Sequence, residues 1–146
     1  MPFGPHIVNV AHIIQVSVAP VFLMSGVGVM LTVFTNRLAR IIDRARVLEE
    51  RIHTVAEPQT AEIYSELNRL AKRSRWNEAA IALTTTTGLL ISLVIVALFV
   101  DDMVAVDLSG LVALLFILAM LAFVGAFVSF LREIMLAMVR IRTAPR

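Results

Sequence analysis

The stretch GVGVMLTVFTNRLARIIDRARVLEERI, residues 26–52, decides the fold, because its character changes at Asn36. Before Asn36 the stretch is apolar and uncharged, and after it apolar residues alternate with charged ones at spacings of three and four. This is the heptad pattern of a helix that packs along one seam. The pattern predicts one helix that leaves a membrane and continues as an arm of a helical hairpin. The seam consists of Leu38, Ile41, Ala45, Leu48, Ile52 and Val55.

Three apolar runs occupy residues 13–34, 79–100 and 108–131. Each reaches the roughly 20 residues that a helix needs to cross a bilayer core. The whole chain of 146 residues is 59% hydrophobic and only 16% charged, which excludes an ordinary soluble domain. We therefore expect an all-α integral membrane protein, a single membrane domain over residues 1–146 with three transmembrane helices.

The positive charges lie on one side of these runs. All 13 Lys and Arg residues fall within residues 37–75 and 132–146, and none lies in residues 1–36 or 101–107. Because Lys and Arg beside a span stay in the cytoplasm during insertion, the N-terminus is expected outside and the C-terminus inside. This orientation makes residues 36–77 a cytoplasmic helical hairpin of a multi-pass protein.

The second arm of the hairpin follows a predicted break at Glu57-Pro58, since proline cannot continue a helix. Its apolar face is formed by Ile63, Leu67 and Leu70. Two antiparallel helices joined by a short turn follow from this pattern. Their apolar seam can pack internally, or it can bind a cytoplasmic protein partner.

Charged and amide side chains mark the inner ends of two spans. Arg37 ends the first span and Glu133 ends the third. A charge at that depth is costly unless it is paired, so we predict an Arg37–Glu133 ion pair with Asn36 bonding nearby. The first interpretation of this cluster is a structural clamp. The alternative is a gate or binding site at the inner mouth of an oligomeric pore.

Four consecutive threonines, Thr84, Thr85, Thr86 and Thr87, lie in the second span. Successive helical residues point in different directions, so some of the four must face the bundle or a partner. Threonine in a membrane helix commonly bonds the carbonyl four residues earlier, which is the first interpretation. The alternative is a path for ions or water, lined by these threonines or by Ser25 and Thr32 of the first span.

Small residues recur along one face of two spans, where they allow close approach between helices in lipid. They predict a homo-oligomer. The two sets are Ser25, Gly28, Thr32 and Asn36 in the first span, and Ala119, Ala122, Ala126 and Ser129 in the third.

The basic arm is expected to meet the membrane surface. Arg73 and Arg75 lie close to the second span, and Trp76 suits the interface level. These three residues are candidates for contact with anionic lipid headgroups. Glutamates interrupt the basic residues of the hairpin, which argues against nucleic-acid binding.

Catalytic chemistry finds no support in the sequence. The absence of cysteine excludes disulfides, thiolate metal sites and a cysteine nucleophile. No nucleophile elbow, phosphate loop or histidine–carboxylate cluster at metal-ligand spacing is present. We therefore expect no enzyme activity, no catalytic residue, no metal and no cofactor.

Short motifs carry a resemblance to a known family. They are the Thr35-Asn36-Arg37 triplet, the Arg-rich arm that enters a Thr/Ser/Gly-containing span, and Phe130-Leu131-Arg132-Glu133 at the exit of the third span. Over roughly residues 13–142 the chain resembles the bacterial membrane family called domain of unknown function 2721. Leu38 stands where many members have an aromatic residue. The resemblance implies a small three-span protein of a bacterial plasma (inner) membrane and no particular activity.

Two functional hypotheses follow. The first is a non-enzymatic membrane scaffold or regulator whose hairpin engages a partner. The second is a homo-oligomeric ion channel or pore lined by Ser, Thr or Asn residues of the first or second span.

Overall fold

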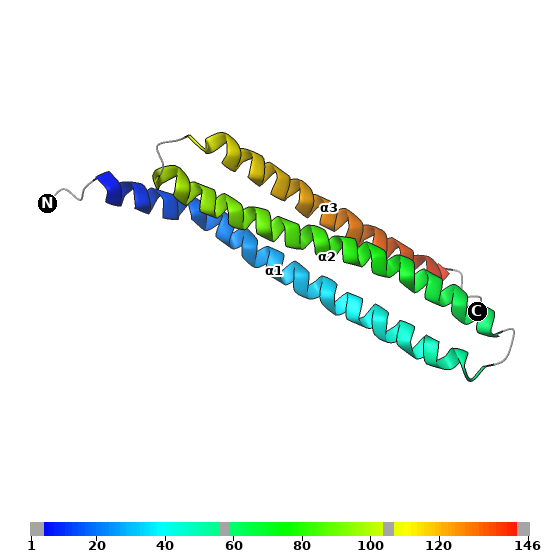
Figure 1. Cartoon of the computed structure of the whole chain (residues 1–146). Coiled ribbons are helices and arrows are strands. Elements are labelled where there is room, and N and C mark those ends of the chain that lie inside the picture. The colour runs from blue at the N-terminus through cyan, green and yellow to red at the C-terminus, as the bar shows by residue number, and fades with distance from the viewer. Residues whose placement is uncertain (1–4, 56–58, 104–106, 143–146) are drawn as a thin grey trace. The chain divides into compact units, whose positions relative to one another are not determined.

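The computed structural model describes residues 5–55, 59–103 and 107–142, and three long helices make up most of them (Figure 1). They are α1 (Pro5–Ile52), α2 (Gln59–Met103) and α3 (Ser109–Arg142). Each is long and apolar enough to cross a membrane, which confirms the all-α prediction with three candidate spans. The predicted break at Glu57-Pro58 lies outside the described residues.

The first apolar run continues into the first arm as one helix. Residues 29–52 contain no glycine or proline, so nothing interrupts the backbone hydrogen bonds of α1 in this part. The helix ends at Ile52, where the amide and the hydroxyl of Thr54 both donate to the carbonyl of Arg51 at 3.0 Å. The first apolar run and the first arm of the hairpin are therefore one continuous helix, as the sequence predicts.

Two compact units divide the helices, and each unit contains a segment of all three. The apolar unit comprises Met1–Met30 and Thr84–Val124. The hairpin unit comprises Leu31–Leu83 and Gly125–Arg146.

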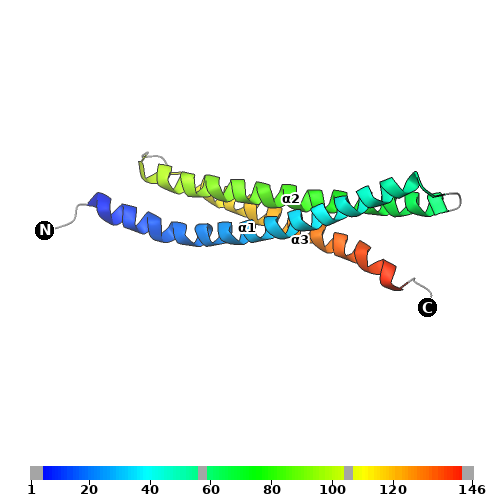
Figure 2. The same ribbon diagram turned by 90° about the horizontal axis from the view of Figure 1, so that it is seen from below.

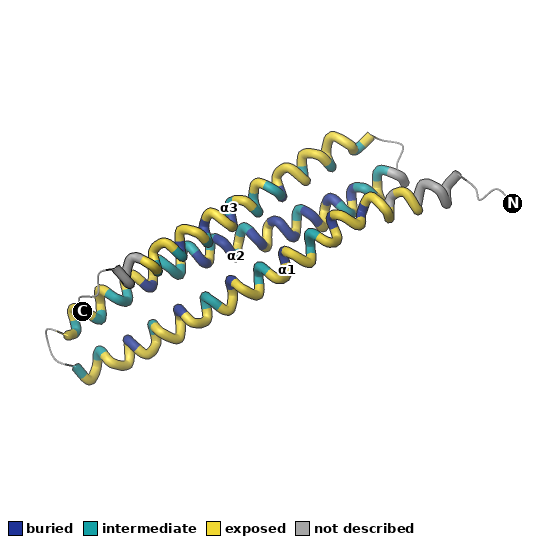
Figure 3. Tube along the Cα trace, turned by 180° about the vertical axis from the view of Figure 1, so that it is seen from behind, coloured by how far each residue is buried: buried dark blue, intermediate teal, exposed yellow. Residues whose placement is uncertain are grey.

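In the apolar unit the buried positions concentrate on one face of α2, while most of α3 is exposed (Figure 3). Thr87 and Ile91 of α2 are fully buried, as is Ala119 of α3. Phe22 is 75% exposed and Leu121 is 63% exposed. Large apolar side chains that face outward are expected when lipid, rather than water, surrounds the helices.

The link between α2 and α3 is closed by two aspartates. Asp101 accepts a hydrogen bond from the Leu108 amide at 2.7 Å, and Asp107 accepts one from the Ser109 amide at 3.0 Å. Hydrogen bonds from the Ser109 side chain and backbone lower the pKa of Asp107 below its ordinary value. The carboxylate of Asp107 therefore satisfies an amide at the start of α3, where helical amides have no internal partner.

In the hairpin unit the C-terminal part of α1 packs against the N-terminal part of α2 (Figures 1 and 2). Ile41, Leu48 and Leu70 form its buried core, with Ala45, Ile63 and Leu67 packed around them. All six belong to the two apolar faces that the spacing predicts. The heptad seam is thus confirmed as the contact between the two arms.

Candidate functional site

A buried carboxylate lies where the three helices of the hairpin unit meet. Glu133 of α3 has no exposed surface. Arg73 of α2 donates to its Oε1 atom from Nε at 3.1 Å and from Nη2 at 2.8 Å. Arg37 of α1 places Nη2 at 2.8 Å from Oε2. One carboxylate therefore links all three helices, and the predicted Arg37–Glu133 ion pair is confirmed.

The two arginines hold this carboxylate differently. Arg73 makes aligned hydrogen bonds, whereas the contact of Arg37 with Oε2 lacks the alignment of a hydrogen bond. The guanidinium of Arg37 also lies over the Phe130 ring, 5.0 Å from its centroid. Both arginine side chains keep about a quarter of their surface exposed, at 27% and 28%. The guanidinium groups therefore keep contact with solvent while the carboxylate is sealed.

A layer of aromatic and amide groups lies beside this cluster. The Phe34 and Phe130 rings pack with centroids 4.9 Å apart at 43°. Asn77 is fully buried, and its Nδ2 atom donates to the Phe34 carbonyl at 2.8 Å. Its Oδ1 atom is buried without a hydrogen-bond partner in the described part of the chain. The side-chain amide that forms a hydrogen bond between two helices in this layer is therefore that of Asn77.

The expectation that Asn36 takes part is corrected, because Asn36 is exposed. Phe34 is buried, and two helical residues further the chain has turned by about 200°, so Asn36 lies on the opposite face of α1. Arg37 comes three residues after Phe34 and returns to the same side. Sequence reasoning chose the amide nearest to Arg37 in the chain and missed the one on α2.

The residues predicted to meet lipid headgroups separate into two groups. The guanidinium of Arg73 hydrogen-bonds to Glu133, which gives Arg73 a contact inside the cluster that the sequence did not predict. Arg75 is exposed, and Trp76 is half-buried with the Arg132 guanidinium 5.2 Å from its ring centroid. Headgroup contact remains a prediction for Arg73, Arg75 and Trp76.

The threonine block divides into buried and exposed members. Thr84 and Thr87 are fully buried, whereas Thr85 and Thr86 are exposed. The Thr87 hydroxyl donates to the Ala119 carbonyl of α3 at 3.4 Å, so it connects two helices. The prediction that some of the four face the bundle is confirmed. A path between subunits needs exposed side chains, which leaves Thr85 and Thr86 as the candidates in this block.

The two stripes of small residues also differ. In α3, Ala119, Ala126 and Ser129 are buried. In α1, Ser25, Gly28, Thr32 and Asn36 are all exposed. The stripe of α3 therefore packs within the chain, and the stripe of α1 lies on its surface.

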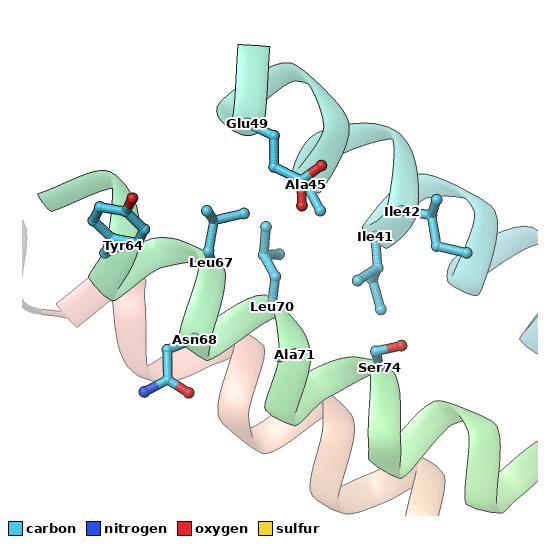
Figure 4. Close-up of a pocket in the computed structure, with 10 residues that line it drawn as sticks. All are labelled: Ile41, Ile42, Ala45, Glu49, Tyr64, Leu67, Asn68, Leu70, Ala71 and Ser74. Atoms are coloured by element: carbon cyan, nitrogen blue, oxygen red, sulfur yellow. The ribbon is translucent and has the colours of Figure 1, made fainter. Parts of the chain in front are cut away.

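Two grooves run between the arms of the hairpin. The apolar groove has a volume of about 460 Å³. Figure 4 shows Ile41, Leu67 and Leu70 projecting into the space between α1 and α2, with Tyr64 at the edge. The groove is lined by Ile41, Ile42, Ala45, Glu49, Tyr64, Leu67, Asn68, Leu70, Ala71 and Ser74.

The basic groove has a volume of about 370 Å³. Its charged residues are Arg37, Arg40, Arg44, Glu66 and Arg73, and its apolar ones are Ile41 and Leu70. Sequence reasoning missed this groove. The signal was present, because Arg37, Arg40 and Arg44 follow at spacings of three and four and therefore share one helix face.

Three long apolar helices with outward-facing side chains, and a hairpin whose two arms share a buried charge cluster with α3, define the class: a small three-helix membrane protein. The family described as "Protein of unknown function (DUF2721)" matches residues 17–143, and the chain belongs to this family. No curated protein and no solved structure matches the chain. The family resemblance drawn from the sequence motifs is thus confirmed, and it assigns no activity.

Proposed function

We propose that this protein is a non-enzymatic scaffold or regulator of the bacterial plasma membrane. In this proposal the N-terminus lies outside, and the hairpin lies in the cytoplasm, where it docks a protein partner. The observation that carries the proposal is the apolar groove, which remains open after the arms have packed against each other.

The chemistry of the groove supports docking of an apolar helix face. Ile42 is 46% exposed and Tyr64 is 58% exposed, on opposite arms. Amphipathic helices bind by laying their apolar face into a groove of this kind. A tyrosine at the edge combines a large apolar ring with a hydroxyl, a combination enriched at protein interfaces. The hairpin thus offers a surface suited to a partner helix.

The buried charge cluster supports the same role, because a docking surface must be rigid. Glu133 connects the two arms to α3 through Arg37 and Arg73. Partners bind more tightly to a surface that is already ordered, since less conformational entropy is lost on binding. We assign the cluster the structural role of a clamp at the base of the hairpin.

Photocrosslinking in cells tests the docking surface. A photoreactive phenylalanine at Tyr64 is expected to give a discrete crosslinked product, because Tyr64 lines the apolar groove. The matched control is Lys72, which is exposed on the same helix and outside the groove. Leu67→Asp in the same chain should abolish the product. The docking proposal fails if position 64 gives no product or if positions 64 and 72 give the same one.

A homo-oligomeric channel is the second candidate, and the exposed face of α1 favours it. Ser25 and Thr32 present polar groups within the first apolar run, and Asn36 presents one just after that run. Polar groups at membrane depth usually face a neighbouring helix or a water-filled lumen. Purified protein in liposomes should then pass ions under a voltage step, and Ser25→Leu should reduce the flux. Liposomes that stay tight under voltage and pH steps would eliminate this candidate.

A further inference from the structure

The basic groove carries more positive charge than its own carboxylates neutralise. Four guanidinium groups line it, and the two carboxylates that face them are Glu66 and the buried Glu133, which leaves an excess of two positive charges. Arg44 donates to Glu66 from Nε at 3.3 Å and from Nη2 at 3.1 Å. Arg40 is exposed, and it makes no ion pair or hydrogen bond within the part of the chain that the structure describes. The groove therefore carries a net positive charge.

The guanidinium groups come from both arms and surround one concave space. Arg37, Arg40 and Arg44 lie on one face of α1, and Arg73 belongs to α2. Like charges at spacings of three and four destabilise a helix, unless an anion compensates them. Beneath them, Ile41 and Leu70 are only 6% and 7% exposed. Apolar side chains at the floor lower the local dielectric, which strengthens attraction between the arginines and an anion.

We propose that the basic groove is a binding site for a phosphate-bearing anion, with Arg40 and Arg44 as its principal ligands. A guanidinium presents donors in a planar fork that matches two phosphate oxygens, and lysine lacks this geometry. The volume of about 370 Å³ is at the small end of ligand pockets, which suits a phosphate group and its immediate substituents.

Two sources share this chemistry: the headgroup of an anionic phospholipid and a soluble phosphate compound. Arg37 to Arg44 spans about 10 Å along α1, at 1.5 Å per residue. The headgroup region on each side of a bilayer is of similar thickness, about 5–8 Å. With Arg37 at the inner end of the first span, the groove lies at headgroup level. The lipid source rests on the orientation proposed above, whereas binding of phosphate rests on the residues of the groove alone.

Calorimetric titration of the purified full chain in a neutral detergent tests the site. The titrants are inorganic pyrophosphate and a short-chain phosphatidylglycerol. Arg40→Gln should weaken binding about tenfold, which is the value of one charge-assisted hydrogen bond. The matched control is Arg46→Gln, which changes an exposed arginine of the same helix outside the groove and should bind like the wild type. Both affinities should fall as NaCl is raised, because salt screens the attraction.

The outcomes of the titration distinguish the possible ligands of the basic groove. Binding of both titrants supports a general phosphate site, binding of phosphatidylglycerol alone supports a lipid site, and binding of pyrophosphate alone supports a soluble ligand. The proposal is overturned if neither titrant binds, or if Arg40→Gln and Arg46→Gln bind equally. The Tyr64 crosslink reports on the other groove, so failure of the anion site and failure of the docking proposal are distinguishable.

Discussion

Glu133→Gln is the substitution that most directly perturbs the cluster at the base of the hairpin. Glutamine has nearly the same volume as glutamate, so the change removes the charge without leaving a cavity. Arg37 and Arg73 then face each other without the carboxylate that lies 2.8 Å from each of them. The amide can accept one hydrogen bond from Arg73, but it cannot balance two positive charges.

The expected loss follows from the contacts and their exposure. Breaking a buried ion pair by removing one partner costs about 3–5 kcal/mol. Glu133 has no exposed surface, which places it in this regime. Both arginines are 27–28% exposed and can recover part of their hydration, so the lower end of the range applies. We expect Glu133→Gln to lower the free energy of unfolding by about 3 kcal/mol.

Unfolding in mixed micelles by titration with dodecyl sulfate, followed by the helical circular dichroism signal, measures this loss. The control is Glu50→Gln, because Glu50 is an exposed carboxylate of α1 and forms no ion pair within the described residues. The control should change stability by less than about 0.5 kcal/mol. A loss below about 1 kcal/mol for Glu133→Gln would refute the clamp, because the value of an exposed ion pair would then describe it better.

Three further predictions concern the contact of α2 with α1, the exposed face of α1 and the start of α3. Gly88→Ala should be less stable than Gly26→Ala by about 1–3 kcal/mol in the same unfolding titration, because a Cβ at Gly88 would lie 3.3 Å from Val27 Cγ1 and one at Gly26 meets nothing within 4 Å. Gly28→Leu should shift the purified protein toward the monomer in light scattering if the exposed stripe of α1 forms the oligomer contact; an unchanged mass would exclude that contact. The hydrogen bonds at the start of α3 lower the pKa of Asp107 below 3.8, so their stabilisation is complete above that value and is lost as the pH falls through the lowered pKa. The protection of the first-turn amides of α3, taken as their exchange rate relative to the intrinsic rate at each pH, should accordingly decrease with falling pH below 3.8 in the wild type and stay constant in Asp107→Asn; equal protection profiles would contradict this assignment.

The sequence predicts the helices and the hairpin because periodicity and run length are local properties. The seam residues Ile41, Leu48 and Leu70 are the buried core of the hairpin, as their spacing requires. The Arg37–Glu133 pair was predictable from a simple rule. Each of the two residues follows an apolar run at the end where the basic residues lie, so both are expected at the same membrane border. The spacing alone gives the relative directions of residues within one helix, and neither prediction needs the rotation of one helix relative to another.

Roles that depend on helix rotation could not be read from the sequence. The second arm contains several arginines. The rotation of α2 about its own axis decides that Arg73, and not the exposed Arg75, contacts Glu133. The same rotation of α2 places Asn77 in the core, where it hydrogen-bonds to the Phe34 carbonyl. A stripe of small residues likewise predicts close packing without saying against what. The stripe of α3 is buried within the chain, and that of α1 is exposed.

The orientation of the chain in the membrane is tested most directly by cysteine labelling in intact cells, because the chain contains no cysteine of its own. Single substitutions Asp107→Cys, in the link between α2 and α3, and Glu50→Cys, in the hairpin, give two reporters at exposed positions. With the N-terminus outside, an impermeant maleimide should label Asp107→Cys in intact cells and should label Glu50→Cys only after the membrane is permeabilised. Labelling of both positions from the same side would contradict this orientation.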